Sequence, residues 1–232
     1  LGVEMPPEKV PEIQKRIIER ANLRGKGVIT ATQMLESMIY SPRPTRAEAS
    51  DVANAVFDGT GGVMLSGETA IGRYPVDAVK MMARITEEAE KRIVTGPMIE
   101  PSRHLRDAAG FSGAVAYSAA RAARELRARA ILTFTESGTT ALLVSKYRPA
   151  CPIIGATTSE EVARRMSLYW GVVSLVFDRV TSTESLVGDV DEELVKTKLA
   201  KKGDVIVITS GVPVGRKGAT NFMKIHRLGE SD

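Results

Sequence analysis

The chain has 232 residues, of which 43% are hydrophobic and 26% are charged, with a formal net charge of +4. This composition is typical of a globular protein with one large or two ordinary domains, and it excludes a disordered chain. The 32 basic and 28 acidic residues are mixed along the sequence and aromatic residues make up only 5%. Without a basic block or a stacking surface, nothing indicates nucleic-acid binding.

Helical and strand periodicities alternate in the first part of the chain. Thr45 and Glu48 have the spacing of a capping box, and the helix that they start is expected to bury Val52, Ala55 and Val56. The expected elements are a helix at 10–24, a short buried strand at 28–32, a helix from Arg46 to about Phe57, a buried strand at 62–66 and a helix from Pro75 to about Arg92.

A polar stretch at 93–106 with Gly96, Pro97 and Pro101 is interpreted as a linker, and a second alternation follows it. Thr158 and Glu161 have the spacing of another capping box. The expected helices are at 112–126, 139–146, from about 159 to about 169 and at 183–200; the expected strands are at 130–134, 153–156, 172–177, 204–210 and 222–227, the last antiparallel.

Strands joined by helices indicate parallel sheets with helical crossovers. The second part has enough strands for a complete α/β domain, whereas the two strands of the first part cannot make a stable sheet with buried faces. We therefore expect the first part to need further strands upstream and the chain to begin, at Leu1, within a domain. Without those strands, the edges of the strands at 28–32 and 62–66 are expected to lie open to pairing.

The remaining single residues point to a cytoplasmic protein. Cys151 cannot form a disulfide within the chain, which favours a reducing, cytoplasmic location. We interpret it as an inert core thiol at the head of a buried strand rather than as a reactive one. His104 and His226 lack metal-ligand spacing and are interpreted as surface or core residues. No apolar run reaches the roughly 20 residues of a membrane span, so no membrane association is expected.

Polar residues follow both expected strands of the first part. Thr32, after the first strand, can donate to an oxyanion or help to carry a proton, or it can simply cap the next short helix. Ser66, after the second strand, lies in a sequence that also suits a plain tight turn with a capping Thr69. We favour a supporting role for Ser66 over a nucleophilic one, because no histidine or lysine base is near it in sequence.

Four segments together resemble the pyruvate kinase family. They are Leu1–Glu4, Thr30–Met38, Pro42–Val56 and Met64–Thr69, in that order and spacing, and the likeness continues through the last hundred residues. The resemblance implies the last part of a (β/α)8 TIM barrel at 1–92, a linker at 93–106 and a C-terminal α/β domain at 107–232. That domain is expected to have a mostly parallel five-stranded sheet and to serve allostery and oligomerisation.

The resemblance also implies a reaction and its site. Pyruvate kinases transfer a phosphoryl group from phosphoenolpyruvate to ADP in glycolysis, with Mg²⁺ and K⁺, as cytoplasmic homotetramers. Thr32 matches the threonine that contacts the substrate carboxylate, and Ser66 matches a hydroxyl of the active-site water network. Arg46 resembles an arginine near subunit contacts. The metal-binding carboxylates, the catalytic lysine and the potassium site match no residue here, so we expect no metal in this chain and no activity from it alone.

A second site is expected in the C-terminal domain. Thr135, Ser137, Gly138, Thr139 and Thr140 follow a strand and open a helix, which can make an anion cradle or a plain structural turn. Arg216 and Lys217 lie in a glycine-rich basic loop. Family members bind a phosphorylated activator with this pair of loops. Glu136, however, stands where members that respond to fructose 1,6-bisphosphate carry a lysine, which weakens the expectation of that ligand.

Two other readings remain open. The chain can be a non-catalytic sugar-phosphate- or nucleotide-binding module built on the second domain, but such a module has no need of the motifs at Thr32 and Ser66. It can also be another barrel enzyme with similar strand-end chemistry, although that reading does not explain a likeness that continues through the final domain.

Overall fold

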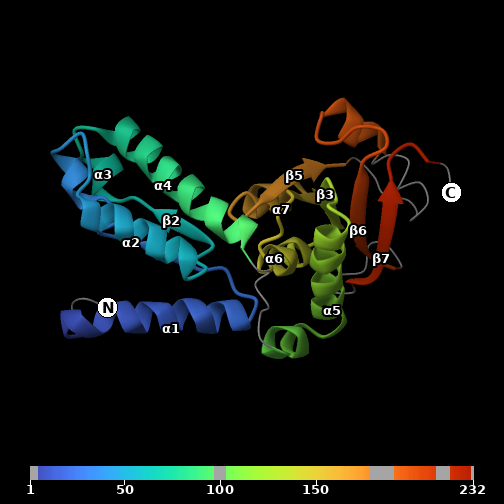
Figure 1. Ribbon diagram of the computed structural model, residues 1–232, viewed down its shortest axis with the longest axis horizontal. Coiled ribbons are helices and arrows are strands. Elements are labelled where there is room, and N and C mark those ends of the chain that lie inside the picture. Colours follow the sequence, from blue (N-terminus) through green and yellow to red (C-terminus); the bar gives the residue numbers. More distant parts are fainter. Residues whose placement is uncertain (1–4, 97–102, 178–190, 213–219, 231–232) are drawn as a thin grey trace. The chain divides into compact units, whose positions relative to one another are not determined.

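The computed structural model describes residues 5–96, 103–177, 191–212 and 220–230, and for 103–108 only the backbone helix (Figure 1). The chain divides into two compact units, residues 1–97 and 98–232. Each unit is described by itself. Within the described residues, no helix is both long and apolar enough to cross a membrane.

Unit 1 consists of helices around a pair of short parallel strands. Strand β1 pairs with β2 so that Ala31 lies opposite Met64, and the two strand ends are therefore neighbours. In chain order the elements are η1 (Pro7–Lys9), α1 (Val10–Leu23), β1 (Ile29–Ala31), η2 (Glu36–Ile39), α2 (Arg46–Phe57), β2 (Gly62–Met64), α3 (Gly67–Ala70) and α4 (Pro75–Thr95).

The capping box predicted at the start of α2 is confirmed. The Thr45 hydroxyl accepts from the Glu48 amide at 3.2 Å, and the Glu48 carboxylate accepts from the Thr45 amide at 2.7 Å. The helix then turns one face inward, and its buried residues are the predicted Val52, Ala55 and Val56. Val52 packs with Leu35 and Met38 of the η2 segment and with Ala78 and Met82 of α4. This core fixes η2 between the two longer helices.

The two strands of unit 1 are shorter and more exposed than predicted. Each has three residues, and Ile29 and Met64 are 53% and 45% exposed. The expectation of fully buried strands is therefore wrong for the described residues. The reason is that β1 and β2 pair only with each other, so within the described chain no further strand covers their outer edges.

Unit 2 is a five-stranded sheet with the order β5-β4-β3-β6-β7. β3, β4, β5 and β6 are mutually parallel, and β7 runs antiparallel to β6, as predicted. The elements are α5 (Arg103–Glu125), β3 (Ala130–Phe134), α6 (Thr139–Ser145), β4 (Ile153–Thr157), α7 (Glu160–Met166), β5 (Val172–Val176), β6 (Val205–Gly211) and β7 (Thr220–Arg227).

Both faces of the central strands are covered. Successive side chains of a strand point to opposite faces, so Ile131 and Val207 pack under α5 and α6, whereas Leu132 and Ile208 belong to the core on the other face. Leu194, from a helical segment at 191–196, covers that second face. Figure 1 shows α5 and α6 beside the sheet. This arrangement makes unit 2 a complete α/β sandwich of helices and sheet.

Element boundaries differ from prediction at three places. α4 continues to Thr95 and α5 already begins at Arg103, so both ends of the predicted linker at 93–106 are helical. α5 is two helices joined at Gly110, whose φ of 54° only glycine adopts easily. The cap of α7 is Ser159, whose hydroxyl accepts from the Val162 amide, and the capping box predicted at Thr158 is wrong. The part of the predicted helix at 183–190 lies outside the described residues.

The cysteine and one histidine of unit 2 can now be placed. Cys151 is half-buried just before β4, and burial raises the pKa of its thiol to about 11, in line with an inert thiol. His226 is buried in β7, but it is more than filler. Its Nε2 lies 2.9 Å from Oδ1 of Asp191, and the other Asp191 oxygen accepts from the Gly229 amide at 2.8 Å. The side chain of His104 lies outside the described residues.

Candidate functional site

The loop that follows β1 has an unusual backbone. Thr32 and Gln33 both adopt the left-handed conformation, with φ of 72° and 54°, which costs a non-glycine residue roughly 1–2 kcal/mol. The side chain of Thr32 is exposed. The next turn, η2, is capped at Leu35 without a side-chain hydrogen bond, so the alternative that Thr32 caps it is wrong. Strain of this kind is common where a loop presents a functional group.

The turn that follows β2 places Ser66 next to this loop. Ser66 is half-buried at the start of the single-turn helix α3, and its hydroxyl makes no capping hydrogen bond. The Thr69 hydroxyl donates to the Ser66 carbonyl at 3.3 Å. A side chain at Gly67 would meet Ile39 Cδ1 at 3.0 Å, so this turn approaches η2 closely.

Glu68 ties the two strand-end loops together. Its carboxylate is buried, with only 2% of the residue exposed. Oε1 accepts from the amide of Leu35 at 3.0 Å, and Oε2 accepts from the amide of Ser66 at 2.8 Å. One side chain thus connects the loop of Thr32 to the turn of Ser66. Local sequence patterns do not indicate this role, because the contact to Leu35 spans 33 residues.

Glu48 holds η2, the short helix that follows the Thr32 loop, through Ser37. Besides closing the capping box, its carboxylate accepts from the Ser37 amide at 2.7 Å and from the Ser37 hydroxyl at 2.6 Å. The amides of Leu35 and Ser37 therefore each donate to a carboxylate, from α3 and α2 respectively. We call Glu48 and Glu68 the carboxylate clamp.

Both carboxylates of the clamp are held ionised. Burial raises the pKa of Glu68, but hydrogen bonds from the amides of Leu35, Glu68 and Ser66 outweigh it, and the pKa lies below its ordinary value despite the neighbouring charge of Glu48. For Glu48 burial also raises the pKa, and the bonds from Ser37 and Thr45 lower it further than burial raises it.

The described residues do not fit a metal ion. Among them no three His, Cys, Asp or Glu side chains come together in a group that could hold one. Both oxygens of Glu48 and of Glu68 accept from N–H or O–H donors, so these carboxylates are engaged by the loops. We assign no metal ligand to the described part of this chain.

In unit 2 the loop 135–140 follows β3. Thr135 continues the sheet through its amide, which donates to the Ala156 carbonyl at 2.9 Å. The hydroxyls of Ser137 and Thr139 are 2.9 Å apart. Gly138 has a φ of +77°, and a side chain there would meet Met166 at 3.2 Å, so both backbone conformation and space require glycine. Glu136 is exposed.

Two further contacts brace this loop. The hydroxyl of Thr140 is buried and lies 2.5 Å from that of Thr220 at the start of β7, so it forms a hydrogen bond inside unit 2. Arg165 of α7, which local sequence patterns do not single out, donates to the Ser137 carbonyl at 2.8 Å.

The described ends of the predicted basic loop are joined to each other. The Asn221 side chain accepts from the Val212 amide at 2.8 Å and donates to the Val212 carbonyl at 2.9 Å. The predicted Arg216 and Lys217 lie outside the described residues.

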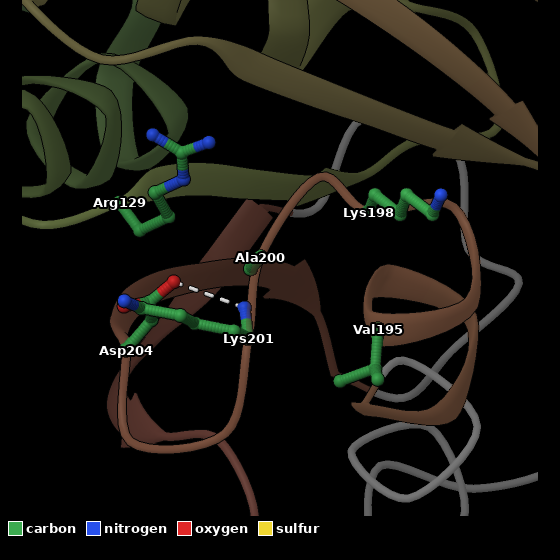
Figure 2. A pocket seen from close by; sticks show the side chains of 6 residues that line it. All are labelled: Arg129, Val195, Lys198, Ala200, Lys201 and Asp204. Carbon is green, nitrogen blue, oxygen red and sulfur yellow. Dashed lines mark hydrogen bonds between the residues drawn. The ribbon is translucent and has the colours of Figure 1, made fainter.

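A separate cavity of about 550 Å³ lies at the opposite ends of β3 and β6. Figure 2 shows its lining residues, including the cations Arg129, Lys198 and Lys201. Arg129 Nε donates to the Leu199 carbonyl, and Asp204 accepts from the Lys201 amide. In Figure 2 the charged ends of Arg129 and Lys198 point away from each other. These cations do not converge on one point, so we assign no ligand to this cavity.

The fold and the strand-end loops define an α/β protein in which a two-stranded parallel sheet precedes a unit with a mostly parallel five-stranded sheet. The pyruvate kinase barrel-domain model matches residues 1–79, and the pyruvate kinase alpha/beta-domain model matches residues 113–226. The chain belongs to the pyruvate kinase family. The resemblance and the fold class stated from the sequence are thereby confirmed.

Individual proteins that are similar to this chain are also pyruvate kinases. The chain is 50% identical over 230 residues to the pyruvate kinase of Sporosarcina psychrophila, covering 99% of this chain and 39% of that protein. It is 46% identical to the pyruvate kinase of Clostridium acetobutylicum, covering 97% of this chain and 47% of that protein. A crystal structure of a pyruvate kinase from Cryptosporidium parvum superposes with a TM-score of 0.85 at 41% identity, over 98% of this chain and 45% of that one. The chain thus spans less than half the length of these relatives.

Proposed function

We propose that this chain forms the later part of the catalytic barrel and the C-terminal domain of a pyruvate kinase, which transfers a phosphoryl group from phosphoenolpyruvate to ADP and yields pyruvate and ATP. The observation that best supports this is identity of 50% over 230 residues, across both units. Because the chain spans 39% of that relative, the activity is proposed for a longer polypeptide that includes this chain.

Within that enzyme, the residues of this chain hold the three-carbon substrate. Thr32 contacts the substrate carboxylate and stands beside the carbon that is protonated after the phosphoryl group has left, and Ser66 belongs to the surrounding hydroxyl and water network. The exposed side chain and strained backbone of Thr32 support this role. The ions that the family implies are Mg²⁺ and K⁺; a divalent ion offsets charge on the transferring group, and its ligands belong to other parts of the polypeptide.

The oligomeric state and the cellular location of the enzyme are part of the same proposal. The family implies a cytoplasmic homotetramer formed through barrel and C-terminal contacts. Arg46 is exposed on α2, which suits a position near a subunit contact.

A pyruvate-formation assay tests the catalytic proposal. Phosphoenolpyruvate, ADP, Mg²⁺ and K⁺ are supplied to this chain alone and to a hybrid polypeptide, in which the chain follows the amino-terminal segment of the Geobacillus stearothermophilus pyruvate kinase, 49% identical to it over 230 residues. We expect activity from the hybrid and none from the chain alone. An inactive hybrid beside an active Geobacillus enzyme would refute the proposal.

A second function is proposed for unit 2 as a binding module for a phosphorylated activator, a sugar phosphate or a nucleotide. The five-stranded sheet with both faces covered supports it, because contacts within unit 2 hold the loop 135–140. The Ser137 and Thr139 hydroxyls and the nearby Arg165 are candidate contacts. Arg216 and Lys217, in the glycine-rich basic segment of the sequence, are further candidates. Calorimetric titration of the chain with sugar phosphates and AMP tests this; no heat and no melting shift for any of them would exclude it.

A further inference from the structure

The carboxylate of Glu68 is the contact that joins the two loops of the proposed catalytic site. It comes from a four-residue helix, α3, which is too short to be rigid without tertiary contacts. Its two oxygens accept from the amides of Leu35 and Ser66. Both amides belong to segments that directly follow a strand of the same two-stranded sheet. This side chain therefore ties the two loops together, in addition to the strand register and the backbone bond from the Arg73 amide to the Ile39 carbonyl at 2.8 Å.

The loop after β1 needs such an external constraint. Thr32 and Gln33 are both left-handed, a conformation that relaxes unless surrounding contacts over-determine it. Bonds of the carboxylate clamp hold the residues that follow, from the Leu35 amide to Glu68 and from the Ser37 amide and hydroxyl to Glu48. Burial makes these hydrogen bonds more important for stability, because a buried amide left without an acceptor costs the full free energy of its desolvation.

We propose that Glu68 is a positioning residue, which fixes the Thr32 loop against the Ser66 turn so that both hydroxyls act on the same bound substrate. This inference rests on the proposed function. Glu68 touches no reacting atom in this account; it acts through the backbone of Leu35 and Ser66. Its low pKa agrees with an ionised acceptor of two amides.

The Glu68→Gln variant tests the contact at nearly constant side-chain volume. A glutamine has one carbonyl oxygen, so it can accept from only one of the two amides, and its NH₂ group faces the other donor. Amide hydrogen exchange of this chain, followed by NMR, should therefore accelerate about tenfold or more at Leu35, at Ser66 or at both. The Ser37 amide, bound to Glu48, is an internal control and should keep its rate.

The matched control is Glu36→Gln. Glu36 is an exposed glutamate in η2, between Leu35 and Ser37. Its replacement should leave the amides of Leu35, Ser37 and Ser66 protected. If Glu68→Gln leaves both Leu35 and Ser66 protected, or if exchange accelerates equally throughout unit 1, then Glu68 does not act as this specific tie. Hydrogen exchange of the unsubstituted chain is itself a test of the clamp. If the amides of Leu35 and Ser66 exchange without protection in that chain, their hydrogen bonds to Glu68 do not form.

Kinetics of the hybrid polypeptide test the consequence. Misplacement of a substrate-facing group by about 1 Å can cost about 100-fold in rate, so Glu68→Gln should lower kcat about 10- to 100-fold while KM for ADP changes less than about threefold. A kcat within about twofold of the unsubstituted hybrid would overturn the positioning role. An inactive unsubstituted hybrid would instead refute the proposed function, and hydrogen exchange would still decide whether Glu68 ties the loops.

Discussion

His226 Nε2 lies 2.9 Å from Asp191 Oδ1, with the imidazole side chain only 3% exposed and the carboxylate side chain 22% exposed. The pair joins β7 to the helical segment at 191–196, which covers one face of the unit 2 sheet. The second Asp191 oxygen accepts from the Gly229 amide. One carboxylate therefore connects the helical segment at 191–196 to β7 and to the turn that follows β7.

Replacing Asp191 by alanine should destabilise unit 2. The change leaves the buried imidazole and the Gly229 amide without their acceptor, at a cost of about 1–3 kcal/mol. Urea unfolding followed by circular dichroism measures this as a lower midpoint. Glu192→Ala, at the exposed neighbouring position, is the control. Equal midpoints for the two variants would show that the pair contributes nothing specific.

Acid should weaken unit 1 through the carboxylate clamp. The folded-state pKa values of Glu48 and Glu68 both lie below their ordinary values. Their stabilisation is therefore complete above the unfolded pKa of about 4.3 and is lost as pH falls through the folded pKa. Glu48→Ala should lower stability at pH 7 by about 1–3 kcal/mol and flatten the acid dependence of unfolding. A variant with an unchanged acid profile would contradict this.

Cys151 should react slowly in the folded chain. Its pKa is raised to about 11 by burial, so little thiolate exists at pH 8, whereas a free thiol titrates near 8.5. A disulfide reagent such as Ellman's reagent should modify the folded chain at least about tenfold more slowly than the chain in denaturant. Equal rates in the two states would show that the thiol is accessible and ordinary.

The exposed strands of unit 1 should promote self-association. Ile29 and Met64 present apolar surface on strands that pair only with each other in the described chain, and open strand edges invite pairing with another chain. We expect concentration-dependent oligomers by size-exclusion chromatography, reduced by Ile29→Lys. Gly27→Lys, at a nearby exposed loop position with open space around it, controls for the added positive charge alone. A stable dilute monomer of the unsubstituted chain would contradict the prediction.

Local patterns predicted the helices well because their signals lie within a few residues. Thr45 and Glu48 are three residues apart, and both bonds of their capping box form as predicted. Thr158 and Glu161 have the same spacing, yet the helix begins after Ser159. The register is set there by Val162 and Met166, which must face the core that includes Ala141. Sequence spacing alone cannot choose between two adjacent polar caps.

The site was only partly predictable for the same physical reason. Strand-end polarity and the family resemblance single out Thr32 and Ser66, whereas the role of Glu68 depends on a contact with Leu35 across 33 residues. Likewise, no local pattern indicates that Thr140 bonds Thr220 or that Asp191 bonds His226, because these pairs are 80 and 35 residues apart. Contacts of this length require the fold before they can be seen.

The most direct test of the central claim is pyruvate formation by the hybrid polypeptide with Thr32 replaced by valine, which keeps the shape and removes the hydroxyl. The account predicts a loss of about 10- to 1000-fold in kcat, because a polar contact beside the reacting substrate is gone. Thr32→Ser, which retains a hydroxyl, should recover much of the rate. Full activity of the Thr32→Val hybrid would contradict the claim that this chain supplies a substrate-facing group through Thr32.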